Sequence, residues 1–261
     1  MAQNSLQITA PRGARGLAAV VALALAGVAL VVFAMVPAGW RLGLWYYDVS
    51  FALMRYAAYV ALAATLTAIV ALIGWPRLLL ARRAMALVAF AVAVPVVYVP
   101  WHYARIAAAT PPIHDVTTDP VNPPTFWAVL PSRAIEEANS VEYGGPAVAK
   151  LQRAYYPQIA PVTTSVPPRA AFAVALGVAQ AMPGWIDVIA EPGAWRIEAS
   201  EESFWMRFTD DVCIRVSPHG AGSRIDVRSL SRQGRGDFGA NARRVTAYLD
   251  ALKTRLAAGA H

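Results

Sequence analysis

The residues best suited to chemistry lie in the second half of the chain, where His114, Asp115 and Asp119 form the one His/Asp cluster of the sequence. Imidazole and carboxylate groups bind metals, but a site needs at least three ligands that converge on one point. These three residues lie in a segment with six prolines, 110–131, where aspartates commonly accept hydrogen bonds from turn amides. The pattern favours turn chemistry, and we expect neither a metal nor a cofactor, although the cluster stays a candidate site.

Nucleophilic catalysis has little support in the sequence. Cys213 is the only cysteine, which excludes an internal disulfide framework and a cysteine zinc cluster. A reactive thiolate needs an activating neighbour, and no histidine adjoins Cys213 in sequence. The Gly-x-Ser-x-Gly turn of serine hydrolases is also missing. We therefore predict no catalytic residue and rank an uncharacterised hydrolase last among the functions considered.

Arginines offer a different chemistry, because their guanidinium groups bind phosphates and carboxylates in a bidentate manner. Strand-like alternation places five of them on one face with three acids: Arg196, Arg207, Arg215, Arg224 and Arg228 with Glu198, Asp211 and Asp226. Such a face is most simply solvated and crossed by ion pairs, each of which stabilises a sheet by about 0.2–1 kcal/mol. The alternative is a surface that binds lipid phosphates or the carboxylates of a partner.

A glycine-containing loop, 229–237, adds Arg232 and Arg235 just before a helix. Loop amides and a helix N-terminus can hold an anion, but the loop has neither a Walker pattern nor a dinucleotide-binding spacing. A tight strand-to-helix turn is the simpler interpretation. The candidate residues for binding an anion or a partner are Arg196, Arg207, Arg215, Arg228, Arg232 and Arg235.

Alternating apolar and polar residues predict the strands that carry these side chains. The predicted strands are 194–199, 203–208, 211–217 and 223–229, with a further strand at 185–189. Short connections favour an antiparallel meander with one apolar and one charged face. Helices are predicted at 144–155, 168–182 and 238–257, the last capped by Asp237. Apolar stripes on the last two should cover the apolar face, which gives a two-layer α+β domain.

The first half of the chain is membrane-like. The whole sequence is 57% hydrophobic and 15% charged, against roughly 25% charged residues in soluble domains. Stretches of 25, 21 and 21 residues without a charge predict membrane-spanning helices at 17–38, 53–75 and 84–102. Pro95 and Pro100 should kink or end the third span. The fold class is therefore α+β, with three transmembrane helices ahead of the two-layer domain.

The charge is concentrated in the membrane half. Residues 1–101 carry seven arginines and one acid, whereas residues 102–261 are nearly neutral, so we expect no nucleic-acid partner. Arginines flank the tail and the second connection more densely than the opposite side: Arg12, Arg15, Arg77, Arg82 and Arg83 against Arg41, Arg55 and Arg105. The positive-inside rule then predicts a multi-pass protein of the bacterial inner membrane, with a cytoplasmic N-terminus and a periplasmic C-terminal domain.

Several ordered motifs resemble one family, the domain of unknown function DUF1499. They are 113–119 (IHDVTTD), 122–126 (NPPTF), 143–146 (YGGP), 210–216 (DDVCIRV), 223–232 (SRIDVRSLSR) and 236–244 (GDFGANARR). The resemblance covers about residues 110–256 and implies membrane spans ahead of the domain, as in proteobacterial members. It transfers no catalytic residues. It also implies that His114, Asp115, Asp119 and the segment 232–244 belong to the folded domain.

These observations predict three parts: a membrane domain at 1–104, a proline-rich strap at 105–131 and a periplasmic α+β domain at 132–261. The expected function is that of a non-enzymatic accessory subunit or interaction protein, whose small residues pack against helices of other membrane proteins. Membrane lipids and other membrane proteins are the expected partners. The alternative is a lipid- or anion-binding envelope module that uses the arginine-rich sheet face.

Overall fold

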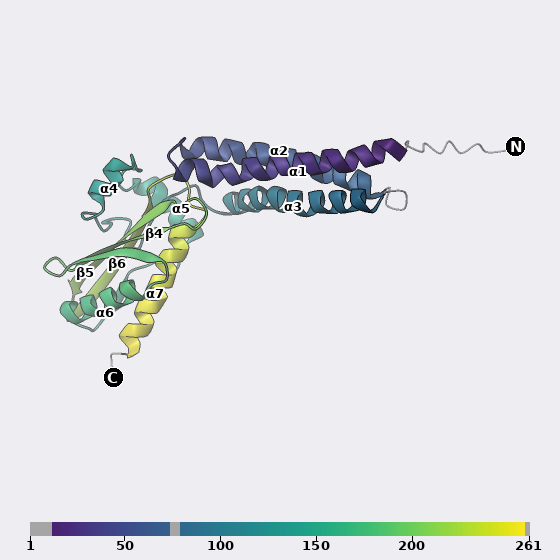
Figure 1. Ribbon diagram of the computed structural model, residues 1–261. Coiled ribbons are helices and arrows are strands. Elements are labelled where there is room, and N and C mark those ends of the chain that lie inside the picture. The colour runs from purple at the N-terminus through teal and green to yellow at the C-terminus, as the bar shows by residue number, and fades with distance from the viewer. Residues whose placement is uncertain (1–11, 74–78, 259–261) are drawn as a thin grey trace. The chain divides into compact units, whose positions relative to one another are not determined.

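The computed structural model describes residues 12–73 and 79–258, and the chain divides into two compact units, Met1–Arg105 and Ile106–His261. The first unit contains α1 (Arg12–Arg41), α2 (Tyr47–Ile73) and all but the last turn of α3 (Leu80–Ala109), shown in Figure 1. Each contains a stretch that is long and apolar enough to cross a membrane. Residues 74 and 75 of the second predicted span, and Arg77, lie outside the described residues.

Of the two outcomes expected at Pro95 and Pro100, a kink or an end of the third helix, the end is wrong. Helix α3 continues through Pro95 and Pro100 to Ala109. Each proline removes one backbone donor, and the carbonyl left without it is tolerated in a membrane helix that packs against neighbours.

Alanines hold the three helices together. On α1, α2 and α3 they recur at alternating spacings of three and four residues, and they are fully buried: Ala22, Ala26, Ala29, Ala57, Ala61, Ala64, Ala68, Ala89 and Ala93. This spacing keeps one narrow stripe of each helix facing its neighbours, and small side chains let the backbones approach closely. Larger side chains such as Leu30, Leu66 and Val88 remain exposed on the outer surface, where lipid would contact them.

The second unit contains an antiparallel sheet in the order β1-β6-β5-β4-β3, and β2 also pairs with β6. The strands are β1 (Asp115–Thr117), β2 (Val162–Thr164), β3 (Trp185–Glu191), β4 (Arg196–Glu202), β5 (Thr209–His219) and β6 (Gly222–Ser231). The helices are α4 (Leu130–Ile135), α5 (Gly145–Tyr155), α6 (Pro168–Ala181) and α7 (Ala240–Ala258). The α+β fold class expected from the sequence is confirmed.

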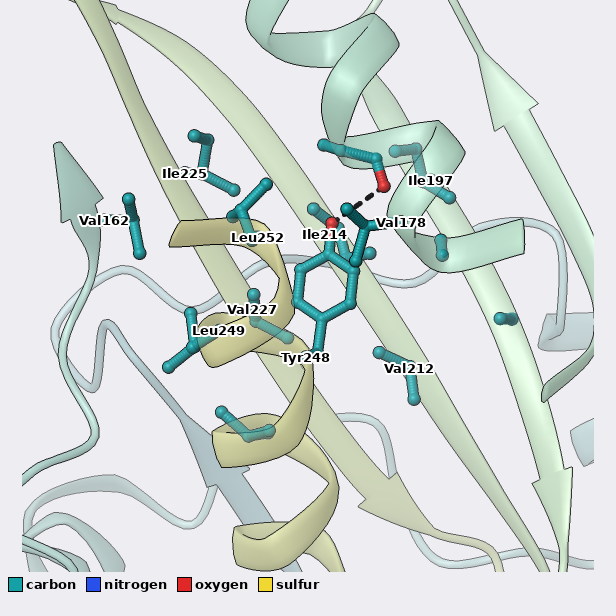
Figure 2. Packing of buried hydrophobic residues seen from close by; sticks show 14 of the residues in the cluster. Val162, Val178, Ile197, Val212, Ile214, Ile225, Val227, Tyr248, Leu249 and Leu252 are labelled. Atoms are coloured by element: carbon teal, nitrogen blue, oxygen red, sulfur yellow. Dashed lines mark hydrogen bonds between the residues drawn. The ribbon is translucent and has the colours of Figure 1, made fainter. Parts of the chain in front are cut away.

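Helices α6 and α7 cover one face of the sheet (Figure 1), and this apolar face is the core of the unit. Val212, Ile214 and Val216 of β5 alternate onto it, as the sequence predicts. Figure 2 shows Tyr248 of α7 among these side chains. Its ring stacks on Trp185, and its hydroxyl donates a hydrogen bond to the carbonyl of Ala175 at 2.9 Å. The polar end of the tyrosine is therefore satisfied inside an apolar layer.

The predicted strand at 203–208 is wrong, because these residues form the turn that joins β4 to β5. The ladder ends with the pair Glu202 and Thr209. Within the turn, the amide of Phe208 donates to the side chain of Ser203 at 2.9 Å, and Arg207 has a φ of +56°. Alternation of apolar residues is not unique to strands, so the pattern alone could not separate a strand from this turn.

The proline-rich segment is more ordered than a linker. It contributes the edge strand β1 and reaches helix α4, which lies across the sheet from α6 and α7 (Figure 1). The simplest expectation for the charged face, full exposure to solvent, is therefore wrong for the part of that face beneath this segment.

Candidate functional site

Residues 118–143, here called the covering segment, lie over the side chains of β4, β5 and β6 that point away from α6 and α7. Contacts with these strands occur along its length, from Thr118, which donates to Asp226 at 3.2 Å, to the carbonyl of Val141, which accepts from Arg228 at 2.7 Å. Near its middle, the ring of Trp127 lies 4.6 Å from the guanidinium of Arg196. The charged sheet face is thus an internal layer, here called the covered face.

Arg228 anchors one part of the covered face. Its guanidinium makes a bidentate ion pair with Asp115 of β1, with Nε–Oδ1 at 3.0 Å and Nη2–Oδ2 at 2.7 Å. It also donates to the carbonyls of Pro124 and Val141 and lies 5.2 Å from the ring centroid of Phe126. Because its charge is buried and paired with Asp115, the guanidinium is held in place, and its hydrogen bonds to Pro124 and Val141 attach the covering segment to β6.

Asp211 is the centre of a second buried group. Its carboxylate accepts two hydrogen bonds from Arg232, at 2.9 and 2.8 Å, and one from Arg133 of α4 at 2.5 Å. The hydroxyl of Ser200 donates to it at 2.7 Å. Two guanidinium groups share this one carboxylate. The partly exposed Glu136 supplies a second negative charge through its ion pair with Arg232. One buried carboxylate of β5 therefore joins β4, α4 and the residue that follows β6.

Glu198 binds the backbone of the covering segment. Its carboxylate accepts hydrogen bonds from three consecutive amides, those of Trp127, Ala128 and Val129, at 2.6, 2.9 and 3.0 Å. These amides belong to the turn that directly precedes α4, so the acid holds this turn, and with it the start of the short helix, against β4. Burial raises the pKa of Glu198, and the three amide hydrogen bonds offset only part of this effect.

The outer end of the covered face is less enclosed. Arg215 and Arg224 both contact Asp119 and Asp226, with Arg215 Nη2–Asp226 Oδ2 at 3.0 Å and Arg224 Nη2–Asp119 Oδ2 at 2.9 Å. Asp119 also accepts the amide of Asn122 at 3.0 Å, which is the turn chemistry expected from the sequence. Two cations face two anions here, so the cluster has no charge in excess.

Cys213 lies between Glu198 and Arg228 on the covered face, fully buried. Its Sγ is 3.3 Å from the carbonyl of Thr125, and burial raises the pKa of the thiol. A protonated thiol beneath a closed segment is a poor nucleophile, because the thiolate is the reactive form.

The remaining candidate arginines lie apart. Arg196 pairs with Glu191 of β3, and Arg207 pairs with Glu202 at 2.8 Å. Arg235 is exposed. The six candidates therefore do not form one surface: Arg228 and Arg232 are buried and paired, whereas Arg207 and Arg235 are open to solvent.

The three residues of the predicted cluster are also separated by their partners. Asp115 binds Arg228, Asp119 binds Arg215 and Arg224, and His114 Nδ1 lies 3.3 Å from the carbonyl of Arg235. Among the described residues, no group of three or more His, Cys, Asp or Glu side chains is arranged to hold a metal ion.

The sequence pattern did not reveal a polar group at the start of α7. The side chain of Asn241 donates to the carbonyl of His114 and to Ser231, both at 2.9 Å. Arg244 binds Glu201 at 2.6 Å and Asp210 at 2.8 Å. Both residues share the buried stripe of α7, and this helical spacing is the signal that could have revealed them.

Arg133 and Glu136 were missed as well, because nothing in the sequence pairs α4 with β5 and β6. The signal available was indirect: a buried aspartate in a strand requires a cationic partner. The sequence does not say which arginine supplies it.

An open groove of about 450 Å³ follows α7 in the second unit, lined in part by Thr110, Tyr156, Arg243 and Thr246. The hydroxyl of Tyr156 has no hydrogen-bond partner among the described residues. Asp250 also lines the groove, so its charge is mixed.

The fold and the covered face define a class of protein: an α+β domain with a buried ion-pair layer, preceded by three helices able to span a membrane. The model of the family described as "Protein of unknown function (DUF1499)" matches residues 115–252, so the chain belongs to this family, as the sequence motifs indicated. The match includes β1 and the covering segment, and it ends within α7. No curated protein matches the chain.

Proposed function

We propose that the protein is a non-enzymatic accessory subunit or interaction protein of a membrane complex. In this proposal it resides in the bacterial inner membrane, with a cytoplasmic N-terminus and residues 106–261 in the periplasm. The observation that supports the proposal is the covered face. The acids, the thiol and two of the candidate arginines that could do chemistry there are buried and occupied by internal partners. What remains for other molecules is the outer surface of each unit.

The outer surface of the helices supports contacts with other membrane proteins. Gly27 of α1 lies on the exposed side, and a Cβ placed on it would meet nothing within 4 Å. Small residues on such a surface permit close packing of a second helix. A bulky residue at this position would therefore block a partner without disturbing the three-helix unit.

The test is co-purification of the full chain from native membranes in mild detergent, after crosslinking. We expect stoichiometric partner proteins with the wild type and their loss with Gly27→Leu. The matched control is Val28→Leu, an exposed neighbour that is already large. Recovery of a single uncrosslinked chain would contradict the proposal, and so would equal recovery of partners with both variants.

The proposed orientation has its own test. Protease added to intact spheroplasts should degrade residues 106–261 and spare the connection between α2 and α3. Protection of the C-terminal unit in intact cells, with digestion only after lysis, would reverse the orientation without affecting the three spans.

A second candidate function is binding of lipids or anions, supported by the exposure of Arg207 and Arg235. The candidate predicts that Arg207→Ala combined with Arg235→Ala weakens binding of the full chain in detergent to vesicles rich in phosphatidylglycerol. Because such binding is electrostatic, it should also fall with added salt. Equal binding by the wild type and the double variant would exclude this candidate.

A further inference from the structure

The turn between β4 and β5 exposes an apolar side chain, although hydrogen bonds fix the backbone of the turn. Phe204 is 95% exposed, whereas Met206, two residues later, is buried. These hydrogen bonds join Ser203 and Phe208, and in one of them the backbone amide of Ser203 donates to the carbonyl of Phe208 at 2.8 Å. Removal of a phenylalanine side chain from water is favourable, so its exposure on an ordered turn is a cost that contact with an apolar phase would reduce.

The register of the sheet shows at which end this turn lies. Asp115 of β1, Leu230 of β6 and Asp211 of β5 are aligned in one row. Strands β1 and β5 both run antiparallel to β6, so their N-terminal ends are at the same end of the sheet. The turn precedes β5, and it therefore lies at the end where the chain enters β1.

The chain reaches that end directly from the third candidate span. Helix α3 ends at Ala109, and β1 begins six residues later, at Asp115. Six residues extend over at most about 21 Å. Near the end of α3, Tyr98, Trp101 and Tyr103 are exposed, in the arrangement of the aromatic belt found at the membrane–water boundary. The end of the sheet that carries the β4–β5 turn is thus joined to the aromatic residues of α3 by a short stretch of chain.

We propose that the β4–β5 turn is a membrane contact, in which Phe204 enters the boundary between lipid headgroups and acyl chains. Arg207, which is 61% exposed on the same turn, lies at the level of the lipid phosphates. The partner is the bilayer that holds α3. The inference rests on the membrane spans and is independent of the proposed accessory role, so either can fail alone.

The test uses the full chain, purified and reconstituted into vesicles of phosphatidylcholine and phosphatidylglycerol. Cys213 is buried, so a cysteine introduced at an exposed position can be labelled selectively with a fluorophore. The test variant is Phe204→Cys. One control is His219→Cys at the other end of β5, whose 11 residues extend over about 37 Å. A second is Val121→Cys, a 92% exposed position of the covering segment.

Brominated lipids should quench the label at position 204 several times more strongly than the labels at 219 and 121. Iodide in the aqueous phase should show the reverse order. Equal lipid quenching at 204 and 219 would overturn the proposal. Protection of position 204 from both quenchers would also overturn it, because the side chain would then be covered by protein.

The label itself can disturb the turn, so a second measurement uses Phe204→Trp without a label. The expected result is that brominated lipids quench the tryptophan emission of this variant by a larger fraction than that of the wild type. No increase in quenched fraction, with unchanged thermal unfolding in detergent, would contradict the membrane contact.

Discussion

The two faces of the sheet are packed through different kinds of interaction. The apolar face packs against α6 and α7 through aliphatic and aromatic side chains, whose attraction is not directional. The covered face is held by bidentate guanidinium–carboxylate pairs and by three amides that converge on Glu198. An apolar layer tolerates small shifts, whereas these pairs bind only in one geometry.

This difference suggests what the covered face is for. A buried ion pair contributes little net stability, but removal of one partner is costly, because the other charge remains buried. The covering segment contains few helical or strand residues, and its aromatic side chains Phe126 and Trp127 contact cations. We infer that the ion pairs hold this irregular segment in one position on the sheet.

The largest expected effect comes from Asp211→Ala. The substitution leaves Arg133 and Arg232 without their shared carboxylate, and we expect a loss of about 3–5 kcal/mol in the free energy of unfolding. Chemical denaturation of the full chain in detergent measures this loss. A change below about 1 kcal/mol, the range of exposed ion pairs, would show that the covered face is open to water.

The apolar face provides the comparison through Ile225→Ala. Ile225 is fully buried, so the lost contacts and the cavity should cost about 2–5 kcal/mol. The two faces should differ in where protection from hydrogen exchange is lost. Asp211→Ala should expose amides of residues 118–143 first, whereas Ile225→Ala should lower protection across the whole second unit. Identical exchange patterns in the two variants would show that the two faces of the sheet do not open separately.

The pKa of Glu198 gives the covered face a characteristic pH dependence. Burial raises this pKa in the folded state, so the folded chain binds the proton more tightly than the unfolded chain. The associated stability is present below about pH 4.3, the ordinary glutamate value, and is lost as pH rises through the folded pKa. Relative to Glu198→Gln, the wild type should therefore lose stability as pH rises through this window. A relative gain with rising pH would mean that the amide hydrogen bonds dominate.

The smallest effect is expected at the exposed pair of Arg207 and Glu202. Replacement of Glu202 by Ala should change the free energy of unfolding by less than about 1 kcal/mol, because water already screens both charges. The substitution is the matched control for Asp211→Ala, since each removes one acid that pairs with arginine. A loss as large as that of Asp211→Ala would show that burial is not the deciding variable.

The sequence predicts the apolar face well. Alternation in β4, β5 and β6 and the stripes of α6 and α7 depend on local periodicity, which a single sequence contains. The same holds for the three apolar helices. The prediction of a strand at 203–208 failed because Phe204 and Met206 follow a strand-like pattern but differ completely in burial.

The covered face could be predicted only in part. Alternation placed Arg228, Asp211 and Glu198 on one side of the sheet, but their partners come from distant segments. The pairing of Arg228 with Asp115 joins residues 113 positions apart. Nothing local distinguishes a charged face that meets water from one that meets a covering segment.

Hydrogen exchange at the amides of residues 127–129 tests the central claim most directly, since all three donate to Glu198. In the wild type we expect these amides to exchange as slowly as those of the β5–β6 ladder, and only when the segment opens. Exchange as fast as that of an exposed loop would show that the segment does not stay closed on the sheet.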